Sequence, residues 1–132
     1  MATIFTRIVN GEIPCYKIAE DDKYFAFLDI NPIREGHTLV ITKQETDYIF
    51  DLDDSTLAGL IVFSKKISKA ISSAIPCARI GVAVVGLEVP HTHIHLVPID
   101  TVQDLDFKNP KLRFTPEQFR ETAEKISRNV VL

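Results

Sequence analysis

The feature that most constrains the fold is a row of histidines, His91-Thr92-His93-Ile94-His95-Leu96-Val97. If this stretch forms a β-strand, its side chains alternate between two faces, so the three histidines share one face. Thr92, Ile94 and Leu96 share the other face, which is suited to a core. Imidazole titrates near neutrality and serves as nucleophile, proton donor or metal ligand. Because three adjacent imidazoles disfavour one another's charging, the row predicts a chemical site rather than a purely structural face.

The composition limits the kind of protein that carries this row. A length of 132 residues, 45% of them hydrophobic and 25% charged, is typical of a single globular domain spanning 1–132. The net charge of −3, with no run of Lys or Arg, argues against a nucleic-acid partner. No stretch is apolar enough for a membrane span, and the N-terminus lacks signal-peptide features. Cys15 and Cys77 lie far apart and favour free thiols, so we expect a soluble cytoplasmic domain.

Hydrophobic periodicity predicts both strands and helices. Strands are expected over 16–19, 23–30, 37–42, 79–85 and 91–99, and a short helix over 3–9. The longest helix is expected over 51–74, with N-cap oxygens from Asp53, Asp54 and Ser55. A second main helix begins at Thr115-Pro116-Glu117-Gln118, which combines an N-cap, an N1 proline and a capping-box glutamine. Short turns favour antiparallel neighbours. The prediction is an α+β domain with a mostly antiparallel sheet of about five strands and two main helices.

Three further features stand outside this pattern. Residues 100–114 show no clear periodicity and are expected to form an irregular loop with a solvated basic patch: Lys108, Lys111 and Arg113. His37 begins a strand after Gly36, where it is either structural or faces a pocket built from loops. Asp29 lies near the end of an aromatic and apolar strand, where it either caps the following Asn-Pro turn or binds a ligand hydroxyl.

Three histidines on one strand face suit two kinds of chemistry. In the first, a neutral imidazole attacks an electrophile such as phosphorus, and the flanking rings hold the developing charge. In the second, the row supplies metal ligands, with another ligand from elsewhere in the chain. No H-x-x-E-H, H-x-H-x-D-H or Cys cluster accompanies the row. The residues alone therefore favour phosphorus chemistry over metal chemistry, with both still open.

The row resembles the histidine-triad (HIT) signature, His-x-His-x-His with apolar residues between and after, Thr92 being a polar departure. The resemblance covers about residues 3–99 and looks like the Hint-type branch of that family. The other matching segments, in order, are Ile4-Phe5, Ile8, Gly11-Glu12-Ile13-Pro14, Glu20-Asp21-Asp22, Ala26-Phe27-x-Asp29-Ile30-x-Pro32 and Gly36-His37-x-Leu39-Val40-Ile41-x-Lys43.

The resemblance implies a HIT-like fold, a sheet extended across a homodimer, and a purine nucleotide as substrate or product. Members of the family cleave at the α-phosphate and release a nucleoside monophosphate. By position, His93 resembles the nucleophile, and His91, His95 and His37 resemble residues that orient the nucleophile and the phosphate. Asp29 matches the aspartate that bonds the ribose hydroxyls. The apolar walls of the base pocket match Ile4, Phe5, Ile8, Phe27 and Ile30.

Three departures from the family pattern concern metal and leaving group. Thr3 and Thr6 stand in place of a Cys-x-x-Cys, and Glu45 in place of a histidine, that bind a structural zinc in bacterial relatives. No metal and no other cofactor is therefore expected. The 85–90 loop is short and lacks the usual Asn and Gln. Glu88 stands where a serine commonly serves the leaving group, as a candidate leaving-group acid or a solvated loop residue.

The leading hypothesis is a nucleotide hydrolase or phosphoramidase acting through a His93-nucleotidyl intermediate. Its substrate is expected to be a nucleoside phosphoramidate or a dinucleotide-type compound. One alternative is a nucleotide-binding or scaffold protein with little catalysis, motivated by the missing Asn and Gln. The other is a metal-dependent hydrolase that uses the histidine row.

Overall fold

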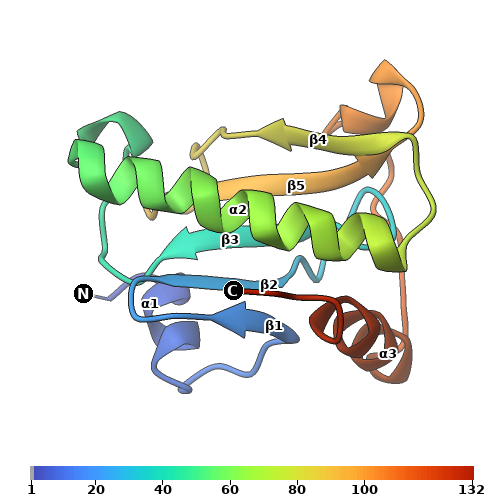
Figure 1. The fold of residues 1–132 in the computed structure, drawn as a ribbon, viewed down its shortest axis with the longest axis horizontal. Helices are drawn as coiled ribbons and strands as arrows, with labels where there is room; N and C mark the ends of the chain where they lie inside the picture. The colour runs from blue at the N-terminus through green and yellow to red at the C-terminus, as the bar shows by residue number, and fades with distance from the viewer. Residues whose placement is uncertain (1) are drawn as a thin grey trace.

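The structure, a computed structural model, describes residues 2–132. Its five strands form one antiparallel sheet with the order β1-β2-β3-β5-β4 (Figure 1). The strands are β1 (Lys17–Glu20), β2 (Tyr24–Leu28), β3 (Thr38–Thr42), β4 (Arg79–Ala83) and β5 (His93–Ile99). The predicted α+β class and the antiparallel sheet of about five strands are confirmed.

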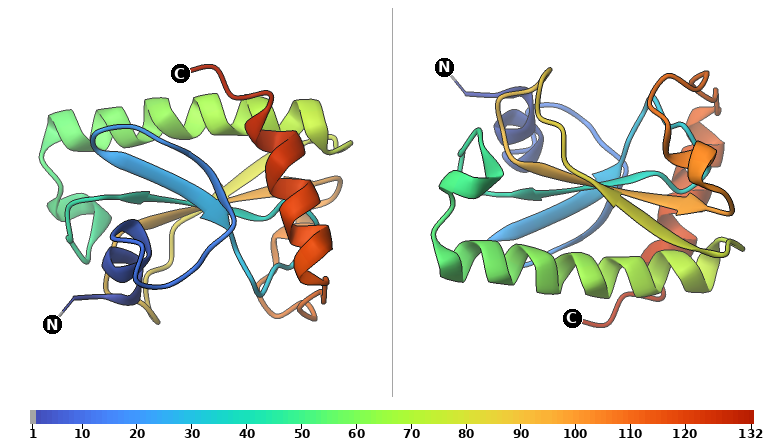
Figure 2. Two further views of the ribbon diagram at one scale, coloured as in Figure 1. Left: turned by 90° about the horizontal axis from the view of Figure 1, so that it is seen from below. Right: turned by 90° about the horizontal axis from the view of Figure 1, so that it is seen from above.

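Three α-helices lie on the two faces of this sheet: α1 (Ile4–Val9), α2 (Asp54–Ala74) and α3 (Pro116–Ser127). Figure 2 shows α2 running along one face and α1 on the opposite face, with α3 crossing one end of the molecule. Two short 3-10 helices, Ile49–Asp51 and Val102–Leu105, interrupt the connections. None of the helices among residues 2–132 has the length and apolar character needed to cross a bilayer.

The predicted caps set the starts of both main helices. Asp53 accepts a hydrogen bond from the Thr56 N–H at 2.6 Å, so α2 begins at Asp54 rather than at residue 51. In α3, the Gln118 N–H donates to Thr115 Oγ1 at 3.1 Å. The Thr115 N–H donates to Gln118 Oε1 at 2.8 Å, which completes the predicted capping box.

The two faces of the sheet build two separate apolar clusters. Toward α2 and α3, the cluster includes Leu28, Val40, Ile94 and Leu96, of which the last three are fully buried. Toward α1, a smaller cluster is aromatic and aliphatic: Phe5, Phe25, Phe27, Leu39 and Ile41. Both sides of the central strands are therefore covered, and the polar side chains that these strands carry are largely buried.

Strand pairing places the histidine row on the α1 face. His95 is paired with Leu39 and His93 with Ile41, so the two imidazoles share the face of these apolar neighbours. The strand begins at His93, which corrects the predicted start at residue 91. Thr92 leaves the ladder because both its N–H and its hydroxyl donate to the Thr46 carbonyl, each at 2.7 Å.

Candidate active site

A cavity of about 510 Å³ opens on the α1 face of the sheet. This volume lies within the range of small-molecule sites. Its walls come from α1, the end of β2, the start of β3, the loop between β4 and β5, β5 itself and residues 107–111. The charged and imidazole side chains that line it are Asp29, His37, Glu88, His93, His95 and Lys111. His91 is not among them and lies fully buried behind the wall.

The backbone holds His93 in one orientation. The ring is 7% exposed, and Phe5 packs edge-on against it with 5.1 Å between the ring centroids. Its Nδ1 lies 2.6 Å from the carbonyl oxygen of His91. A carbonyl oxygen only accepts hydrogen bonds, so Nδ1 carries the ring proton. In the neutral ring the lone pair is then on Nε2, which is the form that a nucleophilic histidine requires.

His37 and His95 form a hydrogen-bonded pair between β3 and β5. The Ile33 N–H donates to His37 Nδ1 at 3.2 Å, which places the His37 proton on Nε2. His37 Nε2–H then donates to His95 Nδ1 over 2.9 Å, so neutral His95 carries its proton on Nε2. The His95 and His93 rings are 5.1 Å apart between centroids. The site therefore presents a lone pair and an N–H donor side by side.

The surroundings keep this pair of rings uncharged. Burial lowers the pKa of His37 to about 4, although the Asp29 carboxylate opposes the shift. Burial, followed by the neighbouring His37, His93 and Lys111, lowers the pKa of His95 to about 3. An extra proton on His95 Nδ1 would also face the proton on His37 Nε2. Both rings are consequently neutral at pH 7.

The His91 end of the row is tied to α1 through hydroxyl groups. His91 Nε2 donates to the Thr42 carbonyl at 2.7 Å, and Nδ1 accepts from Thr3 Oγ1 at 2.7 Å. Thr3 also caps α1, since its hydroxyl oxygen accepts from the Thr6 N–H. Glu45 Oε1 accepts from the Thr3 N–H and the Thr6 hydroxyl, both at 2.7 Å. Burial lowers the pKa of His91, although the Thr42 carbonyl favours its charged form.

Both interpretations of Asp29 have a counterpart in the structure. Its Oδ1 accepts the Asn31 N–H at 2.8 Å, which caps the turn after β2. Its Oδ2 lies 3.6 Å from His37 Nε2, a distance too long for a hydrogen bond. Since the residue also lines the cavity, one oxygen holds the turn and the other is available to a ligand.

The five apolar residues expected at a base pocket all line the cavity: Ile4, Phe5, Ile8, Phe27 and Ile30. Phe5 and Phe27 meet edge-on with 5.6 Å between centroids and are buried. Ile30 is 63% exposed and Ile4 47%, which leaves apolar surface uncovered at the cavity mouth. Glu88, in the loop between β4 and β5, also lines the cavity.

Comparison with known protein families decides where this chain belongs. The HIT domain model matches residues 10–102, which is most of the chain. The chain belongs to the HIT family. The predicted resemblance is thus confirmed.

Similar HIT proteins cover the whole domain. A HIT-like protein of Borreliella burgdorferi that has not been characterized is 38% identical, over 96% of this chain and 97% of its own length. An adenosine 5'-monophosphoramidase of Schizosaccharomyces pombe is 33% identical, over 98% of this chain and 99% of its own. Among solved structures, a HIT-like protein of Bartonella henselae, involved in cell-cycle regulation and crystallised with an unknown ligand, superposes with a TM-score of 0.86. It is 32% identical and covers 97% of this chain and 96% of its own.

This HIT domain has a further cavity wall that the sequence did not reveal. The Phe107 ring packs edge-on against the His95 ring with 4.7 Å between the ring centroids, and its centroid lies 6.1 Å from that of the His37 ring. Lys111 is exposed, as predicted for the solvated patch, and it also lines the cavity, which was not predicted. Lys108 and Arg113 are exposed and do not line it. No periodicity in residues 100–114 signals these contacts, because they join segments that are distant in sequence.

The donor groups of this HIT domain fit metal binding poorly. Asp29, His37 and His95 each offer one ligand atom within 4.8 Å of the others. The Ile33 N–H, however, places a proton on His37 Nε2, the atom that faces the other two. At the His91 end of the row, Thr3 and Thr6 offer only hydroxyl groups, and both are already engaged in hydrogen bonds. Zinc sites in proteins are instead built from thiolate, imidazole and carboxylate ligands.

Proposed function

We propose that this protein is a nucleotide-binding hydrolase that cleaves at the α-phosphate of a nucleoside phosphoramidate or a dinucleotide-type substrate. The observation that carries the proposal is the hydrogen bond from His93 Nδ1 to the His91 carbonyl, which leaves the His93 lone pair on Nε2. A neutral imidazole that lines a nucleotide-sized cavity is suited to covalent catalysis at phosphorus. Membership of the HIT family supports the same reaction class.

The reaction proceeds in two displacements. His93 Nε2 forms a bond to the α-phosphorus while the bond from phosphorus to the leaving group breaks. The His95 Nε2–H donates to a phosphate oxygen, where negative charge gathers in the transition state. Water then attacks the same phosphorus, and the nitrogen–phosphorus bond breaks with its electron pair returning to His93 Nε2. A nucleoside monophosphate is released, and one proton of the water passes to the solvent.

The remaining cavity residues bind the rest of the nucleotide. The free Oδ2 of Asp29 accepts hydrogen bonds from the ribose hydroxyls. A purine base packs against the apolar wall formed by Ile4, Phe5, Ile8, Phe27 and Ile30. Glu88, exposed on the 85–90 loop, is the candidate acid for an amine leaving group.

The test is turnover of adenosine 5'-phosphoramidate by the wild type and by His93→Ala. Removal of the nucleophile should lower kcat at least ~10³-fold, while binding of adenosine monophosphate, measured by calorimetry, persists. Wild-type protein given a substrate labelled at the α-phosphate should yield a labelled, acid-labile adduct that the variant does not form. Unchanged turnover in His93→Ala would refute the mechanism. A wild type that binds the monophosphate and turns over no substrate would instead support a nucleotide-binding scaffold.

The proposal extends to a homodimer. β4 is an edge strand, and its outer side pairs with no strand within residues 2–132. Val82 on this strand is 58% exposed, and unpaired edges readily pair with another chain. Analytical ultracentrifugation should show a dimer that Val82→Lys weakens, whereas a monomeric wild type would contradict this part. The free thiols of Cys15 and Cys77 support a reducing location such as the cytoplasm.

A further inference from the structure

We propose that Lys111 forms a second anion subsite in the cavity, which binds an oxyanion of the leaving group beyond the α-phosphate. The inference rests on the proposed function and names its substrate class. That class is a nucleoside 5'-monophosphate joined through a bridging oxygen to a phosphate or sulfate group. Both leaving groups present the same chemistry, a tetrahedral oxyanion, to an ammonium ion.

The charges that line the cavity single out this residue. Within the described part of the chain, Lys111 is the only Lys or Arg on the cavity wall, where the carboxylates are Asp29 and Glu88. Of the histidines on the wall, His37 and His95 do not add positive charge, since burial holds both rings neutral. A substrate with two anionic groups therefore has one cation to meet it. An amine leaving group gains nothing from that cation.

Contacts with Phe107 hold the ammonium group of Lys111. Nζ donates to the Phe107 carbonyl at 3.0 Å and lies 5.8 Å from the centroid of the Phe107 ring. An ammonium group has three donors, and this carbonyl uses one of them. The others remain for a ligand, and an exposed position at the rim allows the group to reach one.

The position of Lys111 along the histidine row indicates which part of the substrate it meets. Phe5, at the proposed base pocket, packs against His93 at 5.1 Å between centroids. Phe107 packs against His95, the next ring along the row, at 4.7 Å. Asp29, the proposed ribose ligand, reaches this end of the row beside His37, from the β2 side of the sheet. Phe107 lies closer to His95 than to His37, on the β5 side. A nucleotide with its ribose at Asp29 and its phosphorus at His93 leaves the β5 side, with Phe107 and Lys111, for its remaining group.

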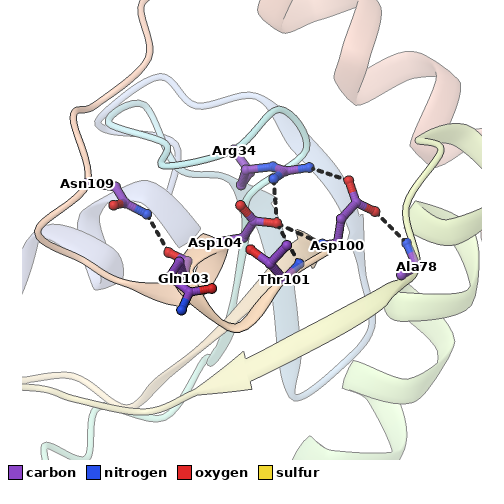
Figure 3. Close-up of polar contacts among 7 residues, drawn as sticks. All are labelled: Arg34, Ala78, Asp100, Thr101, Gln103, Asp104 and Asn109. Atoms are coloured by element: carbon purple, nitrogen blue, oxygen red, sulfur yellow. Dashed lines mark hydrogen bonds and ion pairs between the residues drawn. The ribbon is translucent and has the colours of Figure 1, made fainter.

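The segment that carries Phe107 is anchored to the loop before β3. Arg34 pairs with Asp100 at 3.1 Å and with Asp104 at 2.7 Å (Figure 3). The Asp104 carboxylate also accepts the N–H groups of Asp100 and Thr101. Beyond Lys111, the Leu112 N–H donates to the Pro32 carbonyl at 2.8 Å. Lys111 is thus presented from a segment fixed at both ends.

In the proposed step, His93 Nε2 bonds to the α-phosphorus as the bond from phosphorus to the bridging oxygen breaks. That oxygen keeps the electron pair, so the leaving group departs as phosphate or sulfate without taking a proton. Lys111 stabilises its charge through a charge-assisted hydrogen bond. Hydrolysis of the His93 intermediate then follows as for any other leaving group.

The test compares Lys111→Ala on three adenosine substrates: the 5'-phosphoramidate, the 5'-phosphosulfate and the 5'-diphosphate. We expect kcat/KM to fall about 10- to 100-fold on the sulfate or the diphosphate substrate, and less than about 3-fold on the phosphoramidate. The arm with the larger loss identifies the leaving group. Lys111→Arg should keep most of the activity, and Lys108→Ala, three positions away and outside the cavity, should match the wild type on all three.

Three results would overturn the subsite. Equal losses on all substrates would place Lys111 at the α-phosphate, unchanged rates would remove it from binding, and a wild type that cleaves neither anhydride would exclude the substrate class. Each result is separable from the proposed function, because loss of phosphoramidate turnover in His93→Ala tests that mechanism independently.

Discussion

The two ends of the histidine row hold neutral imidazoles by different means. At the His91 end, a backbone carbonyl of Thr42 and the hydroxyl of Thr3 bind the two ring nitrogens. At the His95 end, the donor to Nδ1 is a second imidazole, His37, instead of a hydroxyl. The Ile33 N–H fixes the tautomer of His37, and His37 in turn fixes the tautomer of His95. His91 is shut away from the cavity, whereas His95 lines it.

This difference between the two ends assigns them different roles: the His91 end positions other groups, and the His95 end takes part in the chemistry. The His91 end contributes a carbonyl that orients His93, and its side chain fastens α1 to the sheet. The His95 end contributes an N–H donor to the cavity, and this donor exists only while His37 keeps its own proton on Nε2. Damage at the His95 end should therefore reduce the rate directly. Damage at the His91 end should reduce stability first and the rate second.

Among changes at the two ends of the row, the largest effect is expected from breaking the imidazole pair with His37→Ala. Without the Nε2–H donor, His95 is free to place its proton on Nδ1 and lose the donor that faces the cavity. We expect kcat to fall about 100-fold, since a wrong histidine tautomer costs up to ~10⁴-fold in other enzymes. His37→Gln keeps an N–H donor near the same position and should recover part of the rate. Equal rates for the Ala and Gln variants in a steady-state assay would refute the tautomer argument.

A second effect appears in the pH dependence of stability. The folded pKa values of about 4 for His37 and about 3 for His95 lie below the usual 6.5. Below about pH 6.5 the unfolded chain binds more protons at these rings than the folded chain does. The free energy of unfolding therefore decreases as the pH is lowered. Between pH 7 and 5 the loss is about 2 kcal/mol for each ring.

Urea unfolding at pH 7, 6 and 5 measures this loss. A variant with His37→Gln and His95→Asn has no titrating ring at that end, so its free energy of unfolding should fall less between pH 7 and 5. The lowered pKa of His91 acts in the same direction and is present in both proteins. Identical slopes for the two proteins would show that the imidazole pair is not the source.

Local signals explain how much of the fold was predictable from the sequence. The cap residues Asp53 and Thr115 act within three residues, and both helices begin where these side chains place them. The alternation of side chains between the two sheet faces along residues 93–99 likewise follows from the local strand geometry alone. The start of β5 was missed because the Thr46 carbonyl, 46 positions away, accepts both hydrogen bonds from Thr92.

Most of the charged and imidazole side chains that line the cavity were among the residues predicted from the sequence, but the contacts between them were not predictable. The residues near the row were identified from their chemistry and from the family pattern. The hydrogen bond between His37 and His95 spans 58 positions and depends on the register of β3 against β5. Phe107 reaches the same pair only because Arg34 anchors the irregular segment before it. Such contacts leave no periodic signal in one sequence.

A smaller effect on the rate is expected from Thr3→Val at the His91 end. Valine keeps the shape of threonine but removes the N-cap acceptor of α1 and the donor to His91 Nδ1. We expect a loss of about 1–2 kcal/mol in the free energy of unfolding, by urea titration, from these two hydrogen bonds. The rate should fall less than about 10-fold, because the His91 carbonyl and Thr42 still hold the nucleophile and its neighbour.

Thr3→Ser retains the hydroxyl and serves as the matched control, with stability and rate near those of the wild type. Glu45→Ala removes the acceptor of the Thr3 N–H and the Thr6 hydroxyl but leaves the bond to His91 in place. It should therefore lower the melting temperature less than Thr3→Val and leave kcat unchanged. A rate loss in Thr3→Val as large as that in His37→Ala would mean that the His91 end takes a direct part in the chemistry, and that the two ends are not divided as described.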